Sequence, residues 1–306
     1  MATYSRNLPA ELVTMILKLV PEKHTLVLRC LSRVWNIAFA CGPYFSALHA
    51  ATLRRAFVRR KVLRNAPIGH WLCCWPQNMK DAAADIAKRA RVCHFHAETC
   101  SSGNPLLMPA SFGLTKFLSS IIIKNLQSPL PASFYTLLKL KFLDLDGSRL
   151  NGPLSPDIGN FKNLQYLSLD SCGLEGPIPG ELGKCVNIMD LKLGNNQFSG
   201  CVPDIFGKFA NIKWLDLSNN NLSGTLDETP SLFTRMNLTT LLLDHNLFTG
   251  SIPESIRNLT SLFSLSLAHN KFTGPIPATL SSITFIKHIV LNNNLLCGPI
   301  PASSFT

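Results

Sequence analysis

A spacing of apolar residues that returns seven times in the second half of the chain constrains the fold more than any other feature. It reads LxxLxLxxNxLxGxIPxxLxxLxx and has a period of 24 residues. Counting the first apolar residue as offset 0, coils 1 to 7 begin at Leu140, Leu164, Ile188, Ile212, Leu238, Leu262 and Ile286. A unit of this length cannot bury its apolar side alone, so the period predicts a solenoid of stacked coils.

The residue type at each offset predicts how one coil is built. Offsets 0, 3 and 5 point inward from a short strand, and offsets 10, 14, 18 and 21 fill the rest of the interior. Glycine stands at offset 12 in every coil and proline at offset 15 in five of them, which favours tight turns over a long α-helix. Coil 4, residues 212–237, has two extra residues, which we expect on the side opposite the strands.

Offset 8 forms a column of polar residues inside the coils. It reads Ser148, Cys172, Asn196, Asn220, Asn246, Asn270 and Asn294. An inward-pointing amide can satisfy the backbone groups exposed where a strand turns into a loop. Because the first two coils lack the amide, we expect that end of the array to be the least regular.

The GxIP signature over residues 140–306 resembles the plant-type leucine-rich repeat. This resemblance implies a right-handed twisted solenoid whose strands line a concave binding face. A shortened, degenerate first coil precedes it, with Leu118, Ile121, Ile123, Leu126, Leu130, Pro131, Phe134 and Leu137. We therefore place the repeat domain at residues 116–306.

The first 50 residues carry an apolar pattern of another kind. Pro9 suits the first turn of a helix, Leu12 and Ile16 recur at helical spacing, and Pro21 ends the segment. A second helix can follow, and Ser32 is a suitable N-cap for a third. Three helices this short cannot bury all their apolar residues on one another, so some are left for a partner.

This stretch resembles an F-box. The matching residues are Leu8, Pro9, Glu11, Leu12, Ile16, Leu17, Leu28, Arg29, Ser32, Arg33 and Trp35. The resemblance implies docking onto the Skp-type adaptor of a cullin-based (SCF) ubiquitin ligase, with the domain behind it recruiting a target. We expect the adaptor-binding surface on Leu8, Pro9, Leu12, Ile16, Leu17, Leu28, Leu31 and Trp35.

The sequence therefore predicts an α+β repeat protein in which a three-helix F-box-like unit, residues 1–50, precedes a right-handed leucine-rich repeat solenoid. Its function would be that of a non-catalytic substrate-recognition subunit. The alternative is a protein-binding or receptor-like module in which the N-terminal helices only cap the solenoid. No nucleophile elbow, P-loop, dinucleotide-binding turn or HExxH motif is present, and we expect no enzyme activity and no cofactor.

Residues 51–115 read as a helical or irregular basic linker. Arg54, Arg55, Arg59, Arg60, Lys61 and Arg64 crowd one short stretch. It suits either nuclear import and an acidic partner or a solvated helix face. No nucleic-acid-binding signature accompanies these residues, and the nearby cysteines and histidines lack the spacing of a zinc site.

Several sequence features indicate the cellular compartment of the protein. No run of 18 apolar residues is free of charge, and Glu11 interrupts what would be the apolar stretch of a secretory signal. We therefore expect a cytoplasmic or nuclear protein without a membrane span, whose ten scattered cysteines are free thiols. Asn221, Asn237 and Asn258 start N-x-Ser/Thr triplets, which would matter only on secretion.

The outward offsets 1, 2, 4, 6 and 7 would form the binding face. Offset 2 carries the aromatic residues Phe142, Tyr166 and Trp214, and offset 6 carries Asp146, Asp170 and Asp244. Outward aromatic residues often dominate interfaces, although they can also simply cover a sheet. We expect these six residues to bind a protein or peptide with a basic segment.

Overall fold

The computed structural model describes residues 94–97, 108, 113, 118–234 and 237–301. The F-box-like unit predicted at 1–50, with its whole adaptor-binding set, lies outside the described residues. So does the basic stretch 54–64. Within the described residues, no helix is long and apolar enough to cross a membrane.

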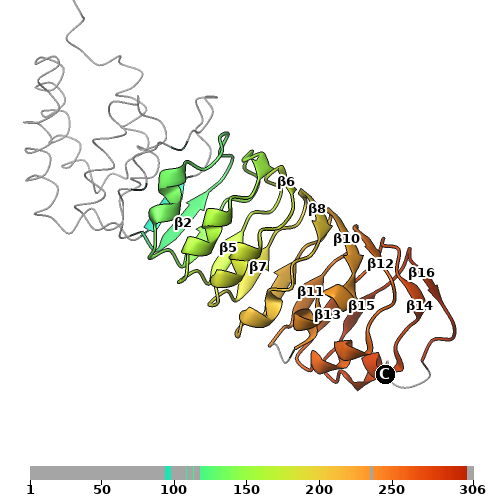
Figure 1. Cartoon of the computed structure of the whole chain (residues 1–306). Helices are drawn as coiled ribbons and strands as arrows, with labels where there is room; N and C mark the ends of the chain where they lie inside the picture. The colour runs from blue at the N-terminus through green and yellow to red at the C-terminus, as the bar shows by residue number, and fades with distance from the viewer. Residues whose placement is uncertain (1–93, 98–107, 109–112, 114–117, 235–236, 302–306) are drawn as a thin grey trace, which may run out of the picture. The chain divides into compact units, whose positions relative to one another are not determined.

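A nine-stranded parallel sheet runs along the array (Figure 1). Its strands follow the order β1-β2-β3-β5-β7-β9-β11-β13-β15. Their bounds are His94–Ala97, Ser120–Ile123, Phe142–Asp144, Tyr166–Ser168, Asp190–Lys192, Trp214–Asp216, Thr240–Leu242, Ser264–Ser266 and His288–Val290. From β3 onward each strand pairs with the same offsets of the next coil, which confirms the predicted stacking.

The sheet begins before the repeat spacing becomes visible. Strand β1 pairs in parallel with β2, from His94↔Ser120 to Ala97↔Ile123. It lies inside the range 51–115 that the sequence analysis treats as a linker. The segment HFHA carries no repeat spacing, so its strand could not be read from the period.

Short turns and narrow ladders form the rest of each coil. The 3₁₀ turns are η5 (Ala132–Thr136), η6 (Pro156–Asn160), η7 (Gly180–Lys184), η8 (Phe206–Lys208), η9 (Leu226–Glu228), η10 (Pro230–Phe233), η11 (Glu254–Asn258) and η12 (Ala278–Ser282). The prediction of tight turns in place of long α-helix is confirmed for coils 1 to 6. Coil 4 contains two such turns, η9 and η10, which accommodate its extra residues away from the strands.

A second parallel sheet and a separate strand pair follow the turns that leave the main sheet. The sheet has the order β12-β10-β8-β6-β4, and the pair is β14-β16. Their bounds are β4 Gly152–Pro153, β6 Leu174–Gly176, β8 Gln197–Cys201, β10 Asn221–Thr225, β12 Leu247–Thr249, β14 Thr273–Pro275 and β16 Leu295–Cys297. The glycine at offset 12 has a positive φ in every coil, for example +92° at Gly224, where an L side chain would be strained.

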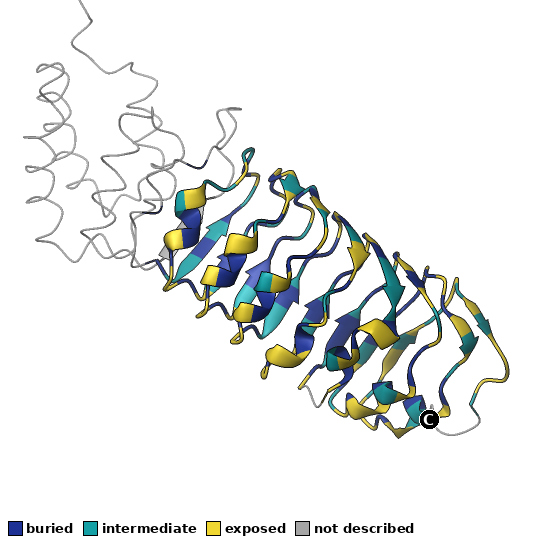
Figure 2. Cartoon of the chain, in the orientation of Figure 1, coloured by how far each residue is buried: buried dark blue, intermediate teal, exposed yellow. Residues whose placement is uncertain are grey.

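The core lies between the main sheet and the turns (Figure 2). The inward offsets of coil 2 are buried as predicted, and the degenerate first coil buries Leu118, Ile121, Ile123 and Leu126 in the same way. Phenylalanines are the largest fully buried side chains of the interior. They are Phe134, Phe161, Phe198, Phe206, Phe209, Phe233, Phe248 and Phe272.

The offset-8 ladder works as the sequence suggests. The amide nitrogen of Asn220 donates to the carbonyl oxygens of Leu193, Leu217 and Ser218 at 3.0, 3.1 and 3.0 Å. Its Oδ1 accepts from the backbone N–H of Phe198 at 3.0 Å. One buried side chain thus satisfies four backbone groups in two coils.

The expected irregularity at the start of the ladder is wrong for the strands, because β2, β3 and β5 stay in unbroken register. Smaller polar groups replace the amide there. Ser148 Oγ accepts from the N–H of Leu126 at 3.2 Å, and Cys172 Sγ donates to the carbonyl of Leu145 at 3.2 Å. A hydroxyl and a thiol therefore retain enough hydrogen bonding to keep the stacking.

A second left-handed position was not apparent from the sequence. Offset 7 has a positive φ in every coil, at Gly147, Ser171, Asn195, Asn219, His245, His269 and Asn293. Glycine, asparagine and histidine tolerate this conformation better than most residues. The histidines of this column, His245 and His269, thus occupy a backbone position that their residue type tolerates, and their rings stack with centroids 4.0 Å apart.

Candidate protein-binding face

The outer face of the main sheet brings the predicted aromatic residues together. Phe142 and Tyr166, on neighbouring strands, stack with ring centroids 4.2 Å apart and an interplanar angle of 6°. Trp214 occupies the same offset two strands further along, with Asp190 between it and Tyr166. All three aromatic residues are half-buried, so each keeps some surface open to solvent.

Lys192 bridges the gap in this aromatic column. Its Nζ lies 5.6 Å from the ring centroid of Tyr166 and 5.2 Å from that of Trp214. Both distances lie within the range of a cation–π contact. We call Phe142, Tyr166, Lys192 and Trp214 the aromatic patch. The sequence analysis missed Lys192, whose only signal was its outward offset 4 on the coil between the two rings.

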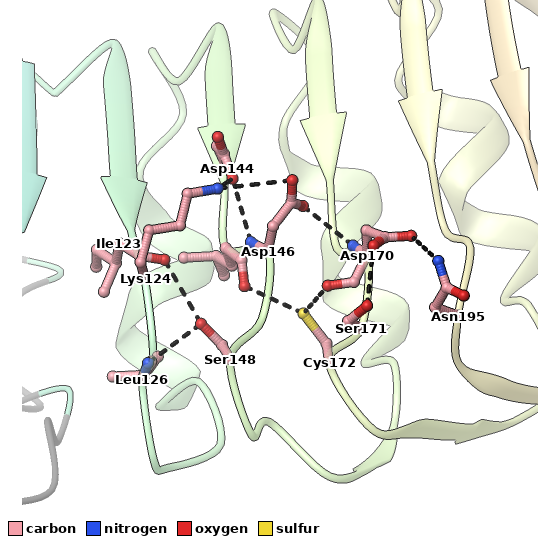
Figure 3. A network of polar contacts seen from close by, with 11 residues as sticks. Ile123, Lys124, Leu126, Asp144, Asp146, Ser148, Asp170, Ser171, Cys172 and Asn195 are labelled. Carbon is pink, nitrogen blue, oxygen red and sulfur yellow. Dashed lines mark hydrogen bonds and ion pairs between the residues drawn. The ribbon is translucent and has the colours of Figure 1, made fainter. Parts of the chain in front are cut away.

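Charges at the N-terminal side of the patch are paired (Figure 3). Lys124 Nζ donates to Asp144 and lies 3.6 Å from Asp146 Oδ2. Burial opposes ionisation of Lys124, but these two carboxylates raise its pKa above the ordinary value. Asp146 Oδ1 also accepts from the N–H of Asp170 at 3.1 Å. This predicted site residue thus belongs to a structural network.

Three further carboxylates, Asp170, Asp216 and Asp244, form what we call the acidic trio. A side chain added at Gly194 would lie 2.8 Å from Asp170 Oδ1 and 3.1 Å from Asp216 Oδ1, so these two carboxylates converge over Gly194 and fill the space there. Burial and the charges of Asp170 and Asp244 raise the pKa of Asp216, although hydrogen bonds from Ser218 oppose the shift. None of the trio forms an ion pair with any residue that the structure describes.

Two buried donors next to Lys192 lack hydrogen-bond partners among the described residues. They are the hydroxyl of Ser168, a residue with no exposed surface, and the indole Nε1 of Trp214. Ser168 and Asp216 are the register partners of Lys192 on the two neighbouring strands. Buried polar groups without partners are uncommon and costly, so each of these two donors needs a structural explanation.

The structure thus joins five of the six residues predicted for this face in one region of coils 1 to 4. Asp244 belongs to coil 5 and reaches the region through its charge on Asp216. Two outward residues at offset 4, Lys192 and Asp216, complete the arrangement. Other outward positions are buried by their neighbours, including Ser168 and Thr240 at 0% and 7% exposure.

With this geometry established, sequence comparison identifies the repeat. The Leucine Rich Repeat family model matches residues 139–161, 163–185, 211–234, 237–259 and 261–283. The array is built of leucine-rich repeats. Coils 3 and 7 lie outside these matches, but their strands β7 and β15 keep the common register. No curated protein matches the sequence.

Solved structures of plant receptors share the fold of the leucine-rich repeats. The Arabidopsis receptor kinase HAESA, in complex with the peptide hormone IDA and the co-receptor SERK1, is 31% identical, with a TM-score of 0.61 and 65% of this chain covered. The plant peptide hormone receptor RGFR1 in complex with RGF2 is 25% identical, with a TM-score of 0.61 and 72% covered. The chain spans 34% of the length of each of these two structures.

Proposed function

We propose that the leucine-rich repeats are a non-catalytic protein-binding module that captures a peptide or an extended protein segment on the aromatic patch and the acidic trio. Similarity to receptors that hold peptide hormones supports this class of ligand. The trio, which no described cation neutralises, favours a ligand with positive charge.

The observation that carries the proposal is the solvent-accessible aromatic column of coils 1 to 4. Aromatic side chains present a large apolar area and lose little conformational entropy on binding, which makes them frequent hot spots. Here the column lies on a rigid parallel sheet, with the Phe142–Tyr166 stack and Lys192 already holding the rings. The face is therefore organised before a ligand arrives.

A paired substitution tests this site. The variant Tyr166→Ala/Trp214→Ala should lose a captured partner, at a cost of about 2 kcal/mol or more for true hot spots. The matched control is Phe263→Ala/His288→Ala, which removes another outward aromatic contact, with centroids 5.3 Å apart, from coils 6 and 7. Quantitative affinity capture from source cells compares both with the wild type. Equal partner recovery from the wild type and both variants would reject the patch as the site.

A second candidate function adds the ubiquitin ligase. We propose it on the F-box pattern from Leu8 to Trp35, which would attach the repeats to a Skp-type adaptor and a cullin complex in the cytoplasm or nucleus. Deleting residues 1–50 should then abolish adaptor pull-down while the repeats stay folded. Unchanged pull-down would reject the F-box assignment.

The receptor-like alternative makes the opposite prediction about the compartment. Asn221, Asn237 and Asn258 are all exposed on the array and would be available for glycosylation in a secreted protein. Mass spectrometry of the protein from its native source distinguishes the two. Glycans on these asparagines would support the receptor-like module, and their absence together with bound adaptor would support the ligase subunit.

A further inference from the structure

We propose that Lys192 is a displaceable internal occupant of a cation-binding site, and that the ligand of this face carries an arginine or lysine that takes its place over Tyr166 and Trp214. This inference rests on the proposed function and names its recognition chemistry. The ligand cation would take over the cation–π contacts of the two rings, and Lys192 would turn towards Asp216.

The first support is the position of the Lys192 ammonium. It lies over two aromatic rings on opposite neighbouring strands, 5.6 and 5.2 Å from their centroids. Such a pair of rings binds an ammonium or a guanidinium by the same electrostatic attraction. The two rings therefore form a cation-binding site, which the chain's own Lys192 occupies.

The second support is Asp216, a carboxylate next to Lys192 that has no counter-charge among the residues that the structure describes. Asp216 stands directly opposite Lys192 in the register of β7 and β9, yet no ion pair joins them. Burial and the like charges of Asp170 and Asp244 destabilise the ionised carboxylate of Asp216, whose pKa is raised. An ammonium released from the rings thus has a carboxylate on the neighbouring strand that gains from its arrival.

The third support comes from the surroundings of the site. The carboxylates of Asp170 and Asp216 both lie against Gly194, so two acidic groups converge at one point of the face. The Ser168 hydroxyl, fully buried, has no partner among the described residues. A peptide that brings a basic side chain to the rings also brings carbonyl oxygens, which can accept from such donors. Converging acidic groups and a buried donor without a partner thus both lie near Lys192.

The competing idea is that Lys192 binds an anion of the ligand directly. Both ideas use the same residue but predict opposite effects of neutralising it. If Lys192 competes with the ligand cation, its removal strengthens binding. If Lys192 pairs with a ligand carboxylate, its removal weakens binding.

Two labelled peptides of equal length, one alternating arginine and glycine and one alternating glutamate and glycine, serve as probes. Fluorescence anisotropy would be measured with the full chain at fixed ionic strength, because such contacts depend on salt. We expect the arginine peptide to bind and Lys192→Gln to tighten its binding about three- to tenfold, which corresponds to loss of a competing cation–π contact. Lys184→Gln, in turn η7 away from the main sheet, should leave the affinity unchanged.

A second variant keeps the test independent of Lys192 itself. Asp170→Asn/Asp216→Asn should weaken binding of the arginine peptide several-fold, because it removes the two charges that converge over Gly194. The inference would be overturned if Lys192→Gln bound the arginine peptide no more tightly than the wild type does. It would also be overturned if the wild type bound the glutamate peptide more tightly than the arginine peptide, or did not bind the arginine peptide at all. In those cases Tyr166→Ala/Trp214→Ala could still lose the natural partner, which would support the proposed binding face. The two proposals can therefore be rejected independently of each other.

Discussion

The outer face of coils 1 to 4 and that of coils 5 to 7 share one backbone but differ in chemistry. Strands β3 to β9 and β11 to β15 pair in the same register, and the strands up to β13 bury the same inward offsets. In β15 of the last coil the inward Ile289 is only half-buried. At offset 2, however, Phe142, Tyr166 and Trp214 give way to Thr240, Ser264 and His288. The inward residues thus specify the stacking, and the outward residues are free to make one half a binding face.

Coils 6 and 7 also contain an outward aromatic contact, but no carboxylates lie beside it among the described residues. Phe263 meets His288 at 5.3 Å, and Lys287 Nζ lies 5.7 Å from the Phe263 ring. No facing pair of carboxylates like Asp170 and Asp216 flanks these rings among the described residues of coils 6 and 7. The two halves therefore differ in the charge beside the rings as well as in the aromatic residues at offset 2.

The largest expected effect tests whether the two halves really share one framework. Leu143→Ala in β3 and Leu265→Ala in β13 each remove a side chain with no exposed surface. Both should lower the free energy of unfolding by about 3 to 4 kcal/mol, since each leaves a cavity in an equivalent place. Urea denaturation measures both. A cost in one half without a similar cost in the other would break the equivalence.

A smaller effect should distinguish the two kinds of offset-8 residue. Asn220→Ala leaves the Phe198 N–H and three carbonyl groups without their partner, and should cost about 2 to 3 kcal/mol. Cys172→Ala removes one weak donor and a small volume, and should cost about 1 kcal/mol. Asn219→Gly, exposed and left-handed, is the control with little expected change. Equal costs for Asn220→Ala and Cys172→Ala would contradict the ladder's proposed role.

The smallest stability effect concerns the acidic trio and depends on pH. Because the pKa of Asp216 is raised in the folded state, the stability linked to its protonation is present below the unfolded-state pKa and is lost as pH rises through the folded-state value. Asp216→Asn should therefore raise the free energy of unfolding at neutral pH, by less than about 1 kcal/mol. It should also reduce the gain on acidification towards pH ~4.

Denaturation curves at both pH values for wild type and Asp216→Asn provide the measurement. Asp227→Asn, exposed in turn η9, is the matched control for a carboxylate outside the trio. A destabilised Asp216→Asn protein at neutral pH would contradict the raised pKa of Asp216.

The sequence was sufficient for the parts of the molecule that repeat. Period, inward offsets and the glycine turns come from residue types that the stacking requires in each coil, and the structure places them as predicted. The aromatic column was also visible, because Phe142, Tyr166 and Trp214 share one offset. Strand β1 was not, since its segment has no repeat spacing.

What the sequence could not give is the direction in which outward side chains turn. Asp216 is the register partner of Lys192, yet the Lys192 ammonium lies over two aromatic rings instead. The orientation of such a side chain depends on the shape of its neighbours. The left-handed backbone at His245 and His269 was hidden for a similar reason, because several residue types occupy that offset. The offset pattern therefore predicts only part of the candidate site.

The central claim, that the first half of the outer face binds the partner, is tested most directly by site-specific photo-crosslinking. A photoreactive phenylalanine analogue would replace Gln165 in one protein and Lys287 in another. Both positions have offset 1, both are exposed, and each adjoins an offset-2 aromatic ring. We predict that the partner crosslinks from position 165 and not from position 287; crosslinking from 287 alone, or equally from both, would contradict the account.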